Sequence, residues 1–190
     1  MGLDMYLSRK KFIGANYEHR NVTGSIDIKI GEKTMPIKFD RLSYIEESVG
    51  YWRKANAIHN WFVNNVQGGE DDCKQYYVSI DQLEELLKVC KEVKEKAIIK
   101  KGTIKNGMRF ENGKWEPITE DGEYIENAEE IEGILPTASG CFFGSTDYDQ
   151  WYMQDIDKTI ELIEEILKDE EEMKKAGFNW ETEYVYQASW

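Results

Sequence analysis

The feature that most constrains the fold is a long amphipathic segment near the end of the chain, from about Tyr148 to Lys175. Apolar residues recur there at spacings of three and four, which predicts a helix with one apolar face. The inward residues of this helix are Ile156, Ile160, Ile163 and Leu167. Such a face must be buried against another layer of structure. Residues 169–172 are acidic and predict a solvated surface, and Gly177 is expected to follow the end of the helix.

Alternation of apolar and polar residues predicts strands in other parts of the chain. A first strand begins at Leu3 and continues toward Ile13, and a last strand covers residues 184–188. Two alternating runs at 26–30 and 35–39 are separated by a short glycine-containing loop and predict a hairpin.

Two further helices are expected before the long one. The first spans residues 44–66, and its apolar stripe consists of Tyr51, Ala55, Ile58 and Phe62. The second opens with Ser79-Ile-Asp-Gln82, which has the form of a capping box. Its inner face consists of Leu83, Leu86, Leu87, Cys90 and Val93.

Residues 98–133 are expected to form an insertion that projects from a single domain of residues 1–190. Asn106-Gly107 is a strong hairpin turn signal, and Asn112-Gly113 repeats it. The acidic, poorly patterned stretch from there to Glu132 predicts a mobile solvated loop after a small hairpin. With a buried strand expected at 141–143, the elements predict an α+β fold with helices packed on a largely antiparallel sheet.

Charge and cysteine content disfavour several classes of protein. The formal net charge of -13 argues against binding of extended nucleic acid, which needs a positive surface. The three cysteines have no CxxC spacing, and neither histidine lies at ligand spacing from a cysteine, so no zinc pattern is present. No apolar run approaches the roughly 20 residues that span a bilayer, and the first residues lack the layout of a signal peptide. We therefore expect an intracellular protein without a membrane partner.

The stretch Gly140-Cys-Phe-Phe-Gly-Ser-Thr-Asp-Tyr-Asp149 is the strongest candidate for a binding segment. Its glycines let the backbone approach a ligand closely beside two phenylalanine rings. The Ser-Thr-Asp triplet offers N-cap candidates for the following helix, whose first N–H groups can hold an anion or a polar ligand edge. The candidate residues are Phe142, Phe143, Gly144, Ser145, Thr146 and Asp147. A buried strand and a capped helix without any ligand fit the same pattern equally well.

A second candidate is Tyr51-Trp-Arg-Lys-Ala-Asn-Ala-Ile-His-Asn-Trp61. On a helix, its arginine, asparagine and histidine would recur on one face as a row of donors. Arginine can bind a phosphate bidentately, asparagine can read an adenine-like edge, and tryptophan can stack on a base. The candidate residues are Trp52, Arg53, Lys54, Asn56 and His59. In the alternative, Trp52 fills the core, His59 is a hydrogen-bonded packing residue, and the cations extend into solvent.

Neither segment contains a nucleophile elbow or a phosphate-binding loop. Asp147, Asp149 and Asp155 are loosely spaced for a metal, and carboxylates at a helix start are favoured by the helix dipole in any case. We expect no metal, no cofactor and a binding protein rather than an enzyme. A small hydrolase that uses His59 with Asp147 or Asp149 is the less favoured alternative.

Several stretches resemble a group of small, largely uncharacterised proteins encoded by bacteriophages and prophages, which begin Met-Gly-Leu-Asp-Met-Tyr-Leu. The matching stretches are residues 1–7, 50–63, 72–79, 140–149 and 186–190. The resemblance implies a phage accessory protein that acts in the cytoplasm of the bacterial host. It brings no catalytic residues.

These observations predict a protein that binds and sequesters a small, phosphorylated, nucleotide-like ligand and so counters a host defence signal. Arg53 and Lys54 would contact phosphate, Asn56 and His59 a base or ribose edge, and the aromatic rings would stack. The alternative is an acidic inhibitor that uses its acidic, aromatic-rich surface to occupy a host protein. A homo-oligomer is compatible with both expectations.

Overall fold

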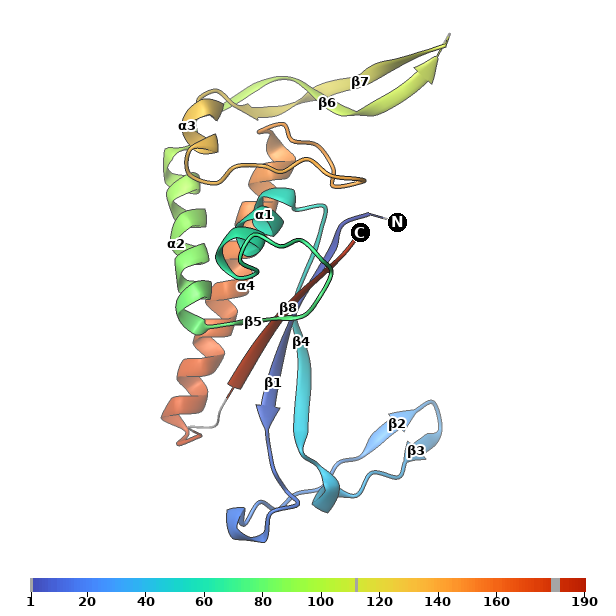
Figure 1. Cartoon of the computed structure of the whole chain (residues 1–190), viewed down its shortest axis with the longest axis vertical. Coiled ribbons are helices and arrows are strands. Elements are labelled where there is room, and N and C mark those ends of the chain that lie inside the picture. Colours follow the sequence, from blue (N-terminus) through green and yellow to red (C-terminus); the bar gives the residue numbers. More distant parts are fainter. Residues whose placement is uncertain (1, 112, 179–181) are drawn as a thin grey trace.

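The computed structural model describes residues 2–111, 113–178 and 182–190. Its centre is an antiparallel sheet of four strands in the order β4-β1-β8-β5. These strands are β1 (Asp4–Phe12), β4 (Tyr44–Arg53), β5 (Tyr76–Val78) and β8 (Thr182–Ser189). The helices α2 (Ile80–Lys96) and α4 (Gln150–Lys175) lie on one side of the sheet (Figure 1). The arrangement confirms the predicted α+β fold and its antiparallel sheet.

The main core lies between this sheet and the helices. From the sheet, Leu3, Met5, Leu7, Tyr184, Tyr186 and Ala188 are buried. The predicted inward residues of α4 face them, with Ile156, Ile160 and Ile163 buried and Leu167 partly buried. The helix α1 (Asn56–Asn65) joins the same core through Phe62, whose ring stacks on Tyr186 at 3.9 Å between centroids. Aromatic stacking therefore joins α1, which contains the end of the second candidate segment, to the last strand.

The helix predicted for residues 44–66 is wrong in its first half, because Tyr44–Arg53 forms the edge strand β4. This strand pairs with β1 from Phe12↔Tyr44 to Asp4↔Arg53. Gly50 makes a close approach possible, since a Cβ there would lie 2.9 Å from Leu162 Cδ1 of α4 and 3.1 Å from Leu7 Cβ. β-branched and aromatic residues in the segment favour a strand, and a mid-helix glycine would cost about 1 kcal/mol.

The remaining helices follow the sequence pattern closely. Helix α2 has the predicted capping box, with Ser79 Oγ accepting from the Gln82 backbone N–H and the Gln82 side chain accepting from the Ser79 N–H. Helix α4 ends at Lys175, and Gly177 has a φ of 83° in the predicted position. The buried strand predicted for 141–143 is wrong: this stretch is loop, and only Phe143 of the three is buried.

Residues between β1 and β4 form an excursion at the far end of the sheet (Figure 1). The predicted hairpin is present there as β2 (Ile28–Ile30) and β3 (Lys33–Met35), with 3-10 turns at Glu18–Arg20 and Phe39–Arg41. All six strand residues are exposed, so this hairpin lies outside the main core.

A second and longer hairpin, which we call the arm, is formed by β6 (Ile99–Glu111) and β7 (Lys114–Ile125). The predicted turn at Asn106-Gly107 is wrong, because pairing continues past it to Glu111↔Lys114 and leaves a bulge there. The other predicted turn coincides with the end of the arm, although Asn112 is outside the described residues. The expected mobile loop is also wrong, since the acidic stretch forms β7 and α3 (Ala128–Glu132).

The arm extends away from the body, whereas its base is part of the core (Figure 1). Ile125 and Ile131 are buried and belong to the main core cluster. Within the described residues, no helix is both long enough and apolar enough to cross a membrane.

Arg9 joins the sheet to the distal part of α4. Its side chain lies on the covered face and is only 6% exposed. Its Nε lies 2.9 Å from Glu47 Oε2 of β4, and its NH1 lies 3.0 Å from Asp169 Oδ2 of α4. Burial raises the pKa of the Glu47 carboxyl, but hydrogen bonds and charge from Arg9 and Lys11 outweigh it and hold that pKa below its usual value.

Replacing Arg9 by methionine should lower the free energy of unfolding by about 1–3 kcal/mol, because both carboxylates lose a charged partner. The loss should be fully present above the ordinary Glu47 pKa of 4.5 and should shrink as pH falls through the lowered folded pKa. Urea unfolding at neutral and acidic pH measures both effects. Lys10→Met is the control, because Lys10 makes only a 3.9 Å pair with Glu46. Equal losses in the two variants would contradict the prediction.

Candidate functional site

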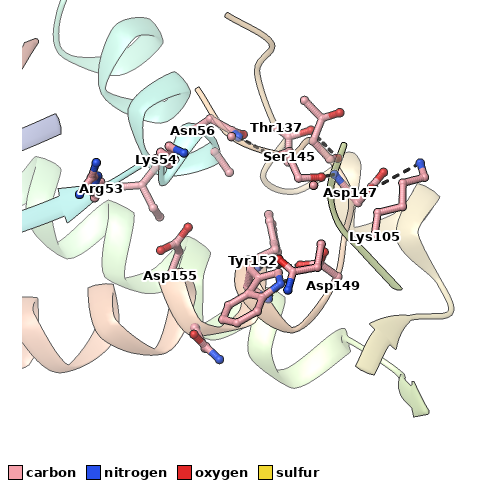
Figure 2. A pocket seen from close by; sticks show the side chains of 18 of the residues that line it. Arg53, Lys54, Asn56, Lys105, Thr137, Ser145, Asp147, Asp149, Tyr152 and Asp155 are labelled. Carbon is pink, nitrogen blue, oxygen red and sulfur yellow. Dashed lines mark hydrogen bonds and ion pairs between the residues drawn. The ribbon is translucent and has the colours of Figure 1, made fainter. Parts of the chain in front are cut away.

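A pocket of about 870 Å³ brings the two candidate segments together (Figure 2). Its walls come from the end of β4, the start of α1, the loop at 137–149, the first turns of α4 and residues 105–108 of the arm. The residues that carry the argument below are Arg53, Lys54, Lys105, Gly144, Asp149 and Asp155. The expected approach of the two segments is therefore confirmed, although their binding role stays a prediction.

Asn56 holds the two segments in contact. Its Nδ2 donates to the backbone oxygens of Phe143 and Ser145 at 3.2 and 2.7 Å, and its Oδ1 accepts from the Ala138 N–H at 3.2 Å. The residue is 4% exposed, so these bonds are shielded from water. Because both ends of the amide are used in this way, Asn56 positions the loop and does not read a base edge as predicted.

The backbone is held in an unusual conformation where the segments touch. Lys54 has a φ of 62° and Phe142 a φ of 63°, in the left-handed region that side chains with a Cβ rarely adopt. Gly144, with φ 95°, packs directly on Lys54, since a Cβ at this glycine would lie 3.2 Å from Lys54 Cβ. Such conformations persist only where surrounding contacts impose them, and they are frequent at binding sites.

Three cations line the pocket in a chain whose net charge is strongly negative. Arg53 lies at the end of β4, with its Nε 3.9 Å from Asp4 Oδ1. Lys105 comes from the arm and lies 3.5 Å from Asp147 Oδ2. Lys54 makes no ion pair with any described residue and is exposed. Figure 2 shows Arg53 and Lys54 at one end of the pocket and Lys105 at the other.

The predicted N-cap residues of the long helix are wrong, because Asp149 caps it. Its Oδ1 accepts from the Trp151 and Tyr152 N–H groups at 2.8 and 3.3 Å. The residue is 3% exposed, and its Oδ2 has no hydrogen-bond partner among the described residues. Burial raises the Asp149 pKa, as does the charge of Asp147, although the backbone N–H bonds oppose the change.

Asp155, nearly two helical turns further along, faces Lys54 across the pocket (Figure 2). Its carboxylate has no hydrogen-bond donor among the described residues. Burial raises the Asp155 pKa to about 7, the charge of Asp149 adds to this, and Lys158 opposes it. The side chain therefore changes charge near neutral pH. A group of this kind in a pocket is a candidate ligand contact.

Four predicted site residues do not line the pocket, and this corrects the expected set. Trp52 is fully buried and donates its indole N–H to Thr159 Oγ1 at 2.9 Å, so it cannot stack on a ligand. Phe143 is also buried, edge-on to His59. Phe142 is 67% exposed and is not among the residues that line the pocket.

His59 is 1% exposed and is committed to structural contacts. Its Nδ1 lies 2.8 Å from the Tyr186 hydroxyl and its Nε2 lies 3.1 Å from Asp71 Oδ2. His59 is therefore a hydrogen-bonded packing residue, as in the alternative interpretation of the sequence. It cannot act with Asp147 or Asp149 as the base of a hydrolase. No cluster of three or more metal-ligating side chains occurs in the described part of the chain.

The other predicted residues of the loop do line the pocket, namely Gly144, Ser145, Thr146 and Asp147. Ser145 Oγ accepts from the Asp147 N–H at 3.0 Å, which orders this turn. The sequence reasoning missed the contributions of the arm and of α4, which include Lys105, Met108, Trp151 and Gln154. The α4 residues could have been found from the sequence. Trp151 and Asp155 are four residues apart and therefore lie on the same face of the helix.

Replacing Asn56 by alanine should free the loop at 137–147 and reduce stability by roughly 2–3 kcal/mol, because buried backbone groups lose their partners. Hydrogen exchange should accelerate in the loop more than in α2. Asn64→Ala is the matched control, since among the described residues the Asn64 amide group donates only to Asn60. Unchanged exchange in the loop would show that Asn56 does not hold it.

No protein-family model, curated protein or solved structure matches the chain. The geometry and charge of the pocket therefore indicate what it binds.

Proposed function

We propose that this protein binds and sequesters a small, phosphorylated, nucleotide-like ligand in the pocket between the two segments. The observation that carries the proposal is the cation group Arg53, Lys54 and Lys105 in a chain of net charge -13. Lys54 is exposed, makes no ion pair with any described residue and has a constrained backbone conformation, so it is available to a ligand anion. Arginine adds a planar pair of donors that fits phosphate oxygens.

The opposite wall suits the rest of such a ligand. Trp151 lines the pocket and is 43% exposed, so its ring can stack on a base. Asp155 can accept hydrogen bonds from the amino or imino groups of a base when it is ionised. Figure 2 shows the Lys54 and Asp155 side chains on facing walls of the pocket. A ligand could therefore place its anionic group at Lys54 and the hydrogen-bond donors of its base at Asp155. This pairing of charges favours a nucleotide over a simple anion.

The biological role proposed here rests on the resemblance to phage-encoded proteins. A protein that holds a nucleotide-like signal without converting it lowers the free concentration of that signal in proportion to its own amount. Sequestration in the bacterial cytoplasm would in this way counter a host defence pathway.

Binding is tested by titration calorimetry against a panel of cyclic and ADP-ribose-type nucleotides. Arg53→Ala should weaken binding of the best ligand by about 1.5–3 kcal/mol, the scale of a charge-assisted hydrogen bond. Lys88→Ala, on the exposed face of α2, is the control and should leave affinity unchanged. Absence of heat with every nucleotide, or equal effects of the two variants, would refute the proposal.

The role of Asp155 predicts a pH dependence. If a donor edge binds the ionised carboxylate, affinity should rise about tenfold between about pH 6 and about pH 8, because this interval spans the Asp155 pKa of about 7. Asp155→Asn should remove this rise in affinity. The only pH dependence left should be that caused by ionisation of the ligand phosphate.

The same variant has a stability readout. The Asp155 carboxyl has a higher pKa in the folded protein than its ordinary value of 3.8. The folded protein therefore becomes less stable as the pH increases from 3.8 through about 7. Asp155→Asn should therefore be more stable than the parent protein above neutral pH and gain nothing in acid. An identical pH profile of stability in both proteins would show that Asp155 is not buried in its charged form.

A further inference from the structure

Three side chains in the first turns of α4 form one wall of the pocket, which we call the base wall. They are Trp151, Gln154 and Asp155, and their spacing of three and four residues places them on one face of the helix. Trp151 and Gln154 are exposed, whereas Asp155 is half-buried. Tyr152 and Ile156 are buried in the core and hold this part of the helix in place. The base wall is therefore a fixed surface that a ligand can contact.

The polar side-chain atoms of the base wall are unused within the described part of the chain. The Asp155 carboxylate accepts no hydrogen bond from a described residue, because the Thr159 hydroxyl donates to the Asp155 backbone oxygen instead. Lys158, whose charge acts on Asp155, lies over the Tyr51 ring, with its Nζ 5.5 Å from the ring centroid. The Gln154 amide also has no hydrogen-bond partner among the described residues. A ligand that donates to Asp155 would replace the hydration that burial removes from this carboxylate.

The form of the carboxylate restricts which base it can bind. When ionised, it presents two acceptor oxygens side by side and no donor. Guanine presents two neighbouring donors, its N1–H and its N2 amino group, whereas adenine and cytosine place a ring acceptor beside their single amino group. Uracil has one N–H between two carbonyl oxygens. Among the common bases, guanine alone can therefore form two parallel hydrogen bonds to Asp155.

We propose that the pocket selects a guanine nucleotide, whose N1–H and N2 amino group donate to Asp155. This assignment rests on the proposed function, because it specifies the base of the same ligand. The Trp151 ring is 43% exposed on the same helical face and can stack on the base. The Gln154 amide can donate to O6, the remaining polar group of that edge of guanine. Lys54 on the facing wall is then left for the phosphate (Figure 2).

Titration calorimetry at about pH 8, where Asp155 is ionised, tests the assignment with a matched series of ligands. The probes are the diphosphates of guanosine, inosine, adenosine and xanthosine, which differ only in the base. The parent protein should bind guanosine diphosphate at least about tenfold more tightly than adenosine diphosphate, the scale of one bidentate contact. Inosine lacks the N2 amino group, so its diphosphate should bind with intermediate affinity.

Asp155→Asn should reverse the preference and make xanthosine diphosphate the best ligand of the four. An amide presents an acceptor oxygen beside a donor nitrogen, which matches the N1–H and O2 of xanthine. A damaged fold could not produce this gain in affinity. Asp157→Asn is the matched control and should leave the order of affinities unchanged. It removes the same charge from the same helix, but Asp157 is paired with Lys94 of α2 and does not line the pocket.

Three results would each overturn the guanine assignment. Guanosine diphosphate could fail to bind, bind no better than adenosine diphosphate, or remain preferred over xanthosine diphosphate in Asp155→Asn. Binding of any other nucleotide in such a case would leave the proposed sequestration of a nucleotide-like ligand standing. Absence of heat with every nucleotide would refute both proposals, so the two failures are distinguishable.

Discussion

The pocket exists because a single buried amide satisfies backbone groups of a loop more than 80 residues away. Asn56 is the first residue of α1, and its three hydrogen bonds fix the loop that carries Ser145 against the helix start. The carbonyl and N–H groups it binds would otherwise be buried without partners, at a cost of about 1–3 kcal/mol each. Lys54 and Gly144 can be in van der Waals contact only because this loop is held in place.

The charges of the pocket depend on how deeply each ionisable side chain is buried. Asp149 and Asp155 lie on a helix that is packed into the core, so desolvation acts on both carboxyls. The cations come from a strand end and from the arm, where their side chains are exposed. The two walls therefore differ in character. One carries exposed cations, and the other carries carboxyl groups whose pKa values are raised by burial.

The sequence predicted the elements whose patterns are local. The capping box of α2 and the apolar stripe of α4 each lie within one segment, so their periodicity was sufficient. Strand β4 was missed because its pairing with β1 comes from a distant part of the chain and outweighs a helix-like spacing. The bulge at Asn106-Gly107 carries the same dipeptide as a turn, and only the register distinguishes the two.

The same limit applies to the site. Arg53 and Lys54 were identified from residue type, and the structure places both at the pocket. Trp52 and His59 have equally suitable chemistry but lie on the core side of the same segment, because the chain changes from strand to helix between them. Lys105 could not be assigned, since nothing in its neighbourhood shows that the arm returns to the loop at Asp147.

The attachment of α4 at both ends determines which parts of the pocket can adapt to a ligand. The helix rises about 30 Å from Asp149 at the pocket to Asp169, which is joined to the sheet by Arg9. A helix fixed in this way cannot tilt without breaking this partly buried ion pair, so its wall presents one shape to every ligand. The loop and the arm are supported by fewer contacts and must supply any induced fit. The rigid wall formed by α4 would then determine which of several similar ligands binds. The loop and the arm would determine how fast a bound ligand is released.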